Sequence, residues 1–497
     1  MAENKFNLID EPWIPVAEKG KVNLRQIFSD TSITSLGGNP VEKISVFKLL
    51  LAIAQSACTP ETEDDWKKLG CSGMQKKVDA YLTEHHDCFW LYGEKPFLQM
   101  PAIAKAELAS YGDVKMEVST GNTSVVTEIQ SEKPLDDSEK ALLVIVLMGF
   151  AFGGKKVDNS VVLTPGYSLK STTGKSGTSL GFMGYTHSFL FADSIADSVY
   201  ENVFTVDMLK EMNMFLSGVG VAPWLEMPVG EDDPIARKLK TSYIGRLIPL
   251  SRFMLLSEKG LAYSEGISHP SYVDFVVDPS VTVDFMAKPK PKLLWIDPER
   301  KPWRQLTSLL AFLDSTNANK FVCYQLKEML HRFAKLNSFT IWSGGVCVSN
   351  NAGEQYLTGT DDFVESEIQL SSEIFSDEHE FFGTLSTQME YLEKDANMLF
   401  GCVSHYYKSL KTDGKSIASQ ATNTYWQLCE TKFQQLVTAC SEDLTGDMAT
   451  KMRKIFNSFV MQIYDETCPK DSARQLEAWA ENKPFMKKEK EEAEENE

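Results

Sequence analysis

The sequence predicts an α+β protein, in which a large mixed N-terminal domain is followed by a C-terminal antiparallel four-helix bundle. The chain has 497 residues, more than one hydrophobic core usually supports, so we expect two domains. Up to about residue 360, short strand-like runs alternate with helical patterns, and beyond about residue 365 long amphipathic patterns follow one another. The predicted domains are residues 1–364, residues 365–484 and a charged tail at 485–497, which we expect to be disordered.

The N-terminal segment Phe6–Val16 predicts a short strand, an acidic turn and a second strand, because Pro12 and Pro15 block a helix. An ordinary N-terminal hairpin is the alternative interpretation. The periodic apolar residues of Ser45–Ala57 predict a helix. Other strand-like runs in this domain are Ser160–Leu163, Thr241–Ile248 and Val281–Phe285.

Four amphipathic segments joined by short loops predict the C-terminal bundle, because short loops place successive helices antiparallel. Gly-containing loops separate the first three segments, and Pro469 precedes the last one. The four predicted helices are Glu378–Leu410, Ser416–Cys440, Met448–Thr467 and Ser472–Asn482.

The net charge of −19 argues against a protein that coats nucleic acid generally, because phosphate binding needs Lys and Arg. The tail Lys487–Glu497 accounts for only −3 of this charge, so the body itself is acidic. Any DNA contact must therefore be local, or must depend on partner subunits. The longest apolar run, Ala141–Gly154, is too short to span a bilayer, and no signal peptide is evident. We expect a cytoplasmic protein without a membrane partner.

The nine cysteines are dispersed and form no CxxC pair, which is typical of reduced, buried thiols. Only Cys71, His85, His86 and Cys88 cluster, and their spacing matches no standard zinc site, so we predict neither a metal nor a cofactor. The sequence also lacks HExxH and GxSxG motifs and any carboxylate spacing typical of two-metal nucleases. We therefore predict a protein without catalytic residues.

The opening Asn7-Leu8-Ile9-Asp10-Glu11-Pro12-Trp13-Ile14-Pro15-Val16, followed by Gly20-Lys21-Val22, resembles the start of CasA, the large subunit of the type I-E CRISPR Cascade complex. Glu94–Gln99 resembles a second stretch of that family, and Leu294–Pro298 lies where the family has an aromatic-proline turn. The order of a mixed domain and a helical bundle also resembles the family. The sequence motifs that carry the resemblance are nevertheless confined to short segments.

The resemblance implies a non-catalytic subunit that recognises the protospacer-adjacent motif through the minor groove, starts duplex opening and helps to recruit the effector helicase-nuclease. The implied partners are other Cascade subunits, the CRISPR guide RNA and double-stranded target DNA. Two alternatives stay open: a structural scaffold subunit without motif readout, and a nuclease with an unrecognised site.

The stretch Asn159–Ala192 contains no acidic residue, although about five would be expected by chance in 34 positions. Gly174-Lys175-Ser176 is not a P-loop, because the required glycine is replaced by Leu169. The resemblance places a glycine-rich loop at the motif duplex here, and small residues allow close approach to phosphates or base edges. An ordinary surface turn is equally supported. The candidate DNA-binding residues are Lys170, Gly174, Lys175, Ser176 and Gly177.

Two further stretches are basic. Pro234–Ser257 lacks acidic residues and is a candidate strip for phosphate or RNA-handle contacts, although a solvated face is the alternative; its basic residues are Arg237, Lys238, Lys240, Arg246 and Arg252. In Ala287–Lys292, alternating prolines predict an extended backbone from which Lys288, Lys290 and Lys292 project. The resemblance implies that one lysine of this region enters the minor groove from a hairpin. A rigid solvated connection is the alternative.

The resemblance implies two more loops. One would insert a wedge below the motif base pairs, and its position is occupied here by Asn350, Asn351 or Ala352; a type I′ turn around the two asparagines is the alternative. The other would touch the guide RNA handle, and it corresponds to the polar stretch Gly121–Pro134, with Asn122, Thr123 and Ser124 as candidates. An ordinary surface loop is the competing interpretation there.

Overall fold

The computed structural model describes most of the chain, and the description below is confined to these residues. They are residues 3–114, 134–150, 184–231, 233–270, 276–313, 321–351, 354–356, 363–443 and 446–484. Two compact units are present: the first comprises Met1–Phe312 and Asn317–Ile368, and the second comprises Leu313–Thr316 and Gln369–Glu497. The domain limits predicted from the sequence, 1–364 and 365–484, stay a prediction. The predicted strand Ser160–Leu163 and the predicted tail lie outside the described residues.

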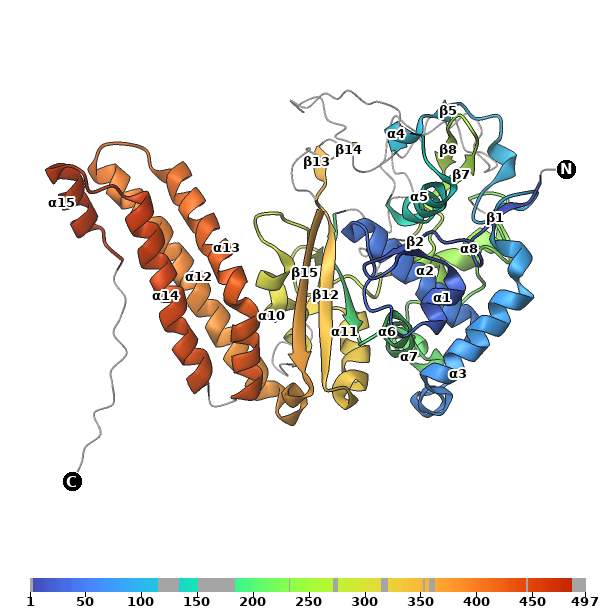
Figure 1. Cartoon of the computed structure of the whole chain (residues 1–497), viewed down its shortest axis with the longest axis horizontal. Helices are drawn as coiled ribbons and strands as arrows, with labels where there is room; N and C mark the ends of the chain where they lie inside the picture. The colour runs from blue at the N-terminus through green and yellow to red at the C-terminus, as the bar shows by residue number, and fades with distance from the viewer. Residues whose placement is uncertain are drawn as a thin grey trace. The chain divides into compact units, whose positions relative to one another are not determined.

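The first unit combines helices of very different lengths with small sheets (Figure 1). In the described part, its helices are α1 (Leu24–Ser29), α2 (Pro40–Cys58), α3 (Glu63–Glu84), α4 (Tyr111–Val114), α5 (Asp137–Gly149), α6 (Ile195–Asn202), α7 (Val206–Glu211), α8 (Pro234–Lys240), α9 (Ile244–Leu247), α10 (Leu306–Leu309) and α11 (Tyr324–Met329). The predicted helix Ser45–Ala57 lies inside α2.

The strands are β1 (Lys5–Asn7), β2 (Ile14–Val16), β3 (Gly20–Val22), β4 (Trp90–Tyr92), β5 (Leu108–Ala109), β6 (His187–Phe191), β7 (Arg252–Leu256), β8 (Leu261–Glu265), β9 (Val283–Asp284), β10 (Lys292–Leu293), β11 (Phe321–Val322), β12 (Ser338–Val346), β13 (Ser349–Asn351), β14 (Glu354–Tyr356) and β15 (Phe363–Ser371). Three described sheets have three strands, in the orders β15-β12-β6, β10-β9-β11 and β5-β8-β7. The remaining pairs are β1-β4, β2-β3 and β13-β14.

The opening segment forms the predicted strand, turn and strand, but not a hairpin of the two. β1 pairs with β4, whereas β2 pairs with β3. Trp13 is fully buried, and its indole N–H donates to the carbonyl of Leu8 at 2.9 Å. This hydrogen bond holds the acidic turn closed, because it joins the two sides of the turn through a buried ring.

The predicted strand Thr241–Ile248 is wrong, because this run forms helix α9 instead. Gly245 explains why this run is helical and not extended. A Cβ at this position would lie 1.9 Å from the carbonyl oxygen of Leu239 at the end of α8. The missing side chain lets α9 pack directly on the backbone of α8. A short apolar run without clear periodicity does not separate a strand from such a buried helical turn.

Helix α2 is the most buried long helix of the first unit. Asn39 caps it and forms a capping box with Glu42, and Pro40 occupies the first turn, where its missing N–H costs nothing. Lys48 points into this core, is 1% exposed, and forms an ion pair with Asp278, which precedes β9. Burial alone would raise the pKa of Asp278, but the Lys48 ammonium outweighs burial and holds that pKa below its usual value.

The second unit contains helices α12 (Glu378–Ser409), α13 (Lys415–Glu442), α14 (Asp447–Thr467) and α15 (Ala473–Glu481). The phenol of Tyr406 near the end of α12 donates to the carbonyl of Pro469 after α14. Near the other end of both helices, Arg453 donates to Gln388 at 2.9 Å. Helices α12 and α14 therefore run in the same direction, and α13 between them in the chain runs oppositely.

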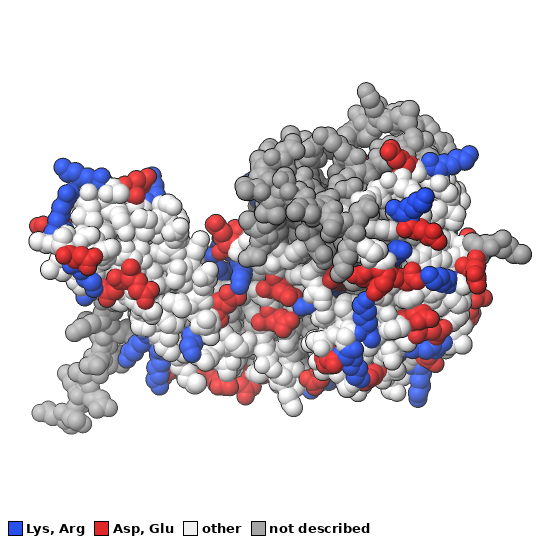
Figure 2. All heavy atoms as spheres, turned by 45° about the horizontal axis from the view of Figure 1, so that its top comes forward, with Lys and Arg blue, Asp and Glu red and all other residues white. Residues whose placement is uncertain are grey.

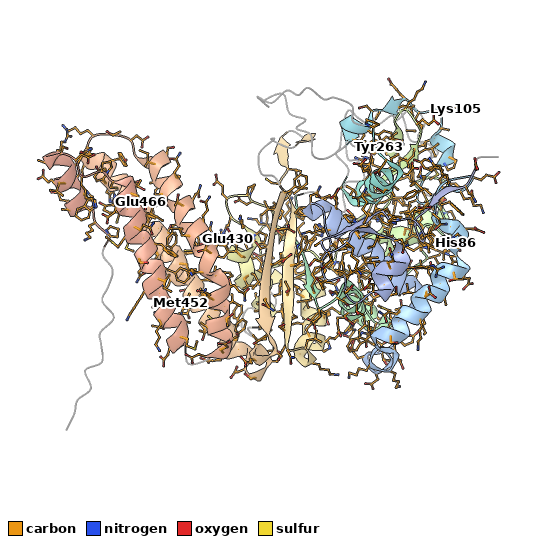
Figure 3. The ribbon with its side chains drawn as sticks, in the orientation of Figure 1. His86, Lys105, Tyr263, Glu430, Met452 and Glu466 are labelled. Atoms are coloured by element: carbon orange, nitrogen blue, oxygen red, sulfur yellow. The ribbon has the colours of Figure 1, made fainter. Side chains whose placement is uncertain are left out.

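The predicted fold class, a mixed α+β domain followed by antiparallel helices, is confirmed. Three helices are long and α15 has only nine residues. Glu430 marks α13 in Figure 3, and Met452 and Glu466 lie near the start and the end of α14.

The buried pair of Lys48 and Asp278 generates a stability prediction. Lys48→Met leaves a buried carboxylate without its counter-charge, so we expect the free energy of unfolding to fall by about 3–5 kcal/mol in urea denaturation at pH 7. The double variant K48M/D278N removes both charges and should recover at least half of the loss. Lys67→Met on the exposed face of α3 is the matched control. A loss below about 1 kcal/mol for K48M would contradict the assignment.

A second prediction concerns Glu201 on α6. Burial raises the pKa of its carboxyl group to about 7, although the Arg332 guanidinium lowers that pKa. Its Oε2 atom is buried without a hydrogen-bond partner among the described residues. The folded state holds this proton up to about pH 7, whereas the unfolded state releases it near pH 4.5. The stabilising contribution is therefore full below about pH 4.5, falls as pH rises from there, and is lost once pH has passed about 7.

We therefore expect Glu201→Gln to be more stable than the parent chain at pH 8, by about 2–3 kcal/mol, and nearly equal to it at pH 4.5. The measurement is urea denaturation across this pH range. Glu211→Gln, at an exposed position on α7, is the control and should leave the pH profile unchanged. Parallel profiles for the parent and Glu201→Gln would show that Glu201 is not the titrating group.

Candidate nucleic-acid interface

The three predicted lysines lie on a hairpin formed by β9 and β10. Antiparallel pairing places Lys292 opposite Asp284, so the chain reverses direction across residues 285–291. Lys288 and Lys290 belong to that loop, Lys292 begins β10, and all three are exposed. The predicted continuously extended Lys-Pro segment is wrong, because the chain turns at residues 285–286 and bends again at residues 288–290. The lysines nevertheless project from a short, charged hairpin.

Backbone hydrogen bonds hold this hairpin on both sides. β11 pairs with the free side of β9. Beyond β10, Leu294 N–H donates to the carbonyl of Thr282 at 3.1 Å, and Thr186 N–H donates to the carbonyl of Leu294 at 3.0 Å. Ile296 N–H then donates to the carbonyl of Gly184 at 2.8 Å. The lysines thus extend from an anchored base rather than from a free loop.

The predicted wedge residues Asn350 and Asn351 lie on β13, which pairs with β14. Asn350 is opposite Gln355, and Asn351 is opposite Glu354. The alternative of a turn centred on the two asparagines is therefore wrong, because both are strand residues and the chain reverses after them. The third candidate, Ala352, lies outside the described residues.

Gly184 brings the base of the lysine hairpin and the end of β12 together. A Cβ at this position, where φ is +79°, would lie 2.6 Å from Cζ3 of Trp295 and 3.0 Å from Cγ2 of Val348. At Gly345 on β12, a Cβ would lie 2.6 Å from the carbonyl oxygen of Tyr185. The strands that lead to the two candidate hairpins therefore pack on one another through glycines. The sequence analysis placed Trp295 only in a turn. The signal available in the sequence was a tryptophan three residues after the last of three closely spaced lysines.

Three of the predicted partner-contact residues lie on α8. Arg237 and Lys238 are exposed, whereas Lys240 is partly buried and pairs with Glu231 at 3.0 Å. In Figure 1, α8 is well separated from β13 and β14. The α8 residues thus lie apart from the β13–β14 hairpin, and their role in partner contact stays a prediction.

The remaining basic residues of that predicted strip are not available for contacts. Arg246 and Arg252 are 1% and 0% exposed. Arg246 donates to the carbonyls of Pro270 and Lys240, and burial lowers its pKa to about 10. Arg252 pairs with Glu265 on β8 at 3.2 Å, beneath Tyr263, which Figure 3 labels. The prediction of a five-residue basic strip is therefore wrong for these two arginines, which are core residues that satisfy carbonyls and a carboxylate.

Several predicted residues lie outside the described part of the chain. They are Asn122, Thr123 and Ser124, and Lys170, Gly174, Lys175, Ser176 and Gly177.

Charge on the visible face is mixed. Figure 2 shows basic and acidic side chains interspersed over the described residues, with no continuous basic surface on the face drawn. This pattern agrees with the net charge of −19. Phosphate contacts on this face would therefore be made by a few local lysines rather than by a broad surface.

Neither a metal cluster nor a membrane helix is found among the described residues. No group of three or more His, Cys, Asp and Glu side chains there could hold a metal ion. His86, one of the four Cys and His residues considered above as a zinc site, instead forms a hydrogen bond between its Nε2 and Oδ2 of Asp10 at 2.7 Å. Figure 3 labels His86. Within the same described residues, none of the helices has both the length and the apolar character needed to cross a bilayer.

A cavity of about 340 Å³ lies between α2, β6 and β12, away from the predicted residues. Aromatic rings form much of its wall, and Lys43 lies at its edge and pairs with Glu365 at 2.8 Å. The lining residues include Phe47, Phe189, Phe191 and Trp342. None of the predicted contact residues lines this cavity.

Solved structures share this fold. The crystal structure of CasA from Thermus thermophilus has a TM-score of 0.72 at 17% identity, covering 96% of this chain and 98% of that chain. Cse1 from Thermobifida fusca has a TM-score of 0.71 at 16% identity, with 96% of both chains covered. A chain of a CRISPR RNA-guided surveillance complex has a TM-score of 0.69 at 14% identity, covering 96% of this chain and 98% of that chain. These similarities establish the class: an α+β unit followed by a helical bundle.

The family follows from the sequence comparisons. The model of the CRISPR-associated protein Cse1 family matches residues 7–481, nearly the whole chain. The CasA/Cse1 protein of Thermus thermophilus is 30% identical over 166 residues, which are 30% of this chain and 32% of that relative. The aligned segment thus spans about a third of the relative's length. This chain belongs to the Cse1 family, which confirms the resemblance to CasA and supports the role of a Cascade large subunit.

Proposed function

We propose that this chain is the non-catalytic large subunit of a cytoplasmic type I-E Cascade complex. It recognises the protospacer-adjacent motif of double-stranded target DNA through the minor groove and starts duplex opening. Its other partners are the remaining Cascade subunits, the CRISPR guide RNA and an effector helicase-nuclease that it helps to recruit. Guide pairing supplies the rest of the specificity, as in other RNA-guided systems.

The observation that carries the proposal is the anchored β9–β10 hairpin with its exposed lysines. A lysine on a narrow hairpin can reach a groove without bringing the acidic body of the chain against the phosphates. Its base packs, through Gly184, against the end of β12 that leads into β13. The arrangement supports motif readout and strand opening by two neighbouring hairpins.

A purely structural scaffold subunit and a nuclease are the two alternatives. A scaffold would leave motif-dependent binding of the assembled complex intact when the hairpins are altered. A nuclease would cleave DNA in a metal-dependent assay on the purified chain. Motif-dependent binding that is lost with the hairpins, together with no cleavage, is the outcome that the proposal requires.

The lysine hairpin yields the first functional prediction. Replacing Lys288, Lys290 and Lys292 by Glu should weaken motif-dependent binding of the assembled complex by at least about 100-fold, because attraction to phosphates becomes repulsion. Binding is measured by gel shift or fluorescence anisotropy at fixed salt. The matched control replaces Lys68, Lys76 and Lys77 by Glu, which gives the same charge change at exposed positions on α3.

Complex assembly is checked for both triple variants by size-exclusion chromatography. If the hairpin variant assembles and binds target as tightly as the α3 variant does, the lysines have no role in motif recognition.

The second functional prediction concerns Asn350 and Asn351. Replacing both by Ala should slow target opening about tenfold or more while leaving initial duplex binding nearly unchanged, because a wedge acts only when a base step is pried apart. A duplex already unpaired beside the motif should rescue the variant. Equal defects on the paired and the unpaired target would instead identify the two residues as motif readers or as structural strand residues.

A further inference from the structure

We propose that Trp295 is a stacking platform for one unpaired base of the opened target DNA. The inference rests on the proposed function and adds to it a residue that holds the strand after opening.

The exposure of Trp295 is unusual for its position. Its side chain is 41% exposed, although its neighbour Ile296 is buried at 6%. Met286 in the loop of the same hairpin is 66% exposed. Two large apolar side chains thus face solvent on a hairpin whose other exposed side chains include three lysines. Apolar surface beside concentrated positive charge is typical of a site for a polyanion that also carries flat apolar groups.

The indole is fixed rather than free. Trp295 and Tyr185 form an antiparallel backbone bridge, and their rings meet edge to face with centroids 4.8 Å apart. The six-membered part of the indole lies directly over Gly184, where a Cβ would be 2.6 Å from Cζ3 and 2.8 Å from Cε3. Since Gly184 also has φ of +79°, glycine meets both requirements of this position. A ring that is already held loses little conformational entropy when a base stacks on it.

The neighbouring charges favour a nucleotide over an apolar protein segment. Lys292 is three residues before Trp295, at most about 10 Å along an extended chain, which corresponds to about three nucleotides at the axial spacing of one stacked strand. Between Asp284 and Asp297 the chain carries three lysines and no acidic residue, so this stretch is net positive. The two flanking carboxylates keep their charge, and each accepts a backbone N–H at 3.0 Å, from Met286 and from Glu299. The lysines can therefore attract phosphates next to the ring.

The base must be unpaired, because a paired base in the helix has both faces covered by its neighbours. Stacking on an aromatic ring tolerates every base, since each has a π-face. The platform would therefore hold the opened strand without regard to sequence, and motif discrimination would stay with other residues. It would act after opening, by slowing the return of that base to the duplex.

The test uses the assembled complex and a target duplex that carries 2-aminopurine at single positions beside the motif, in either strand. In the parent complex, one DNA position should be quenched by stacking on Trp295. Trp295→Leu keeps apolar packing on Gly184 but removes the aromatic face, so it should abolish that quenching and raise the dissociation rate of the opened target about tenfold. Trp295→Tyr should retain both properties in large part. Leu216→Ala, which alters an 82% exposed residue elsewhere in the same unit, is the control.

An abasic site at the quenched position removes the stacking partner, so the parent and Trp295→Leu should then dissociate equally fast. Thermal melting is measured for all variants, and equal melting temperatures show that differences in dissociation do not arise from differences in stability. If the parent complex shows no motif-dependent binding, the proposed function fails. If it binds and opens the target but Trp295→Leu behaves like the parent, the platform alone is overturned. Quenching of 2-aminopurine in the guide RNA instead of the DNA would also overturn it.

Discussion

The buried pair of Lys48 and Asp278 is the constraint on which the candidate interface depends. Lys48 comes from α2 in the middle of the first unit, and Asp278 accepts from the backbone N–H of Ser280 at 3.0 Å. The carbonyl of Ser280 in turn accepts from Ser188 on β6, and Pro279 accepts from Gln325 on α11. One ion pair thus orders the segment that runs directly into β9. Because desolvated charges tolerate little misalignment, the base of the lysine hairpin is placed by the core.

The distribution of cations is compatible with the proposed local contact between an acidic chain and DNA. Arg246, Arg252 and Lys48 are held inside the first unit, where each meets carbonyl oxygens or a carboxylate. Lys48 and Arg252 add little to the external field, because each is paired with a carboxylate. None of the three can touch a phosphate directly, although all raise the count of basic residues in the sequence. The exposed lysines on the β9–β10 loop are few, so their effect depends on projection from the body rather than on number. Screening then confines their attraction to about 10 Å at ordinary salt.

Much of the fold was predictable, and the site much less so. The long helices α12 and α13 begin and end within two residues of their predicted limits, because amphipathic periodicity extends over many turns. Helix α9 was missed, since four residues show no period and a glycine contact with α8 decides the conformation. The two buried arginines looked like surface charge, because burial depends on carbonyls and carboxylates supplied by other segments. The residues next to each arginine in the sequence do not indicate which distant groups will pair with it.

The candidate interface assembles from segments far apart in the chain, and this is why the sequence alone does not reveal it. Gly184 contacts Trp295, more than 100 residues later, and Val348, more than 160 residues later. Each contact requires closure of a long loop, which costs chain entropy that only a well-packed core can offset. Lys48 and Asp278 are themselves 230 residues apart. The strands that lead to the two hairpins are therefore fixed only once the whole first unit has folded. The recognition proposed for the two hairpins would accordingly require the complete unit, and neither hairpin alone would suffice.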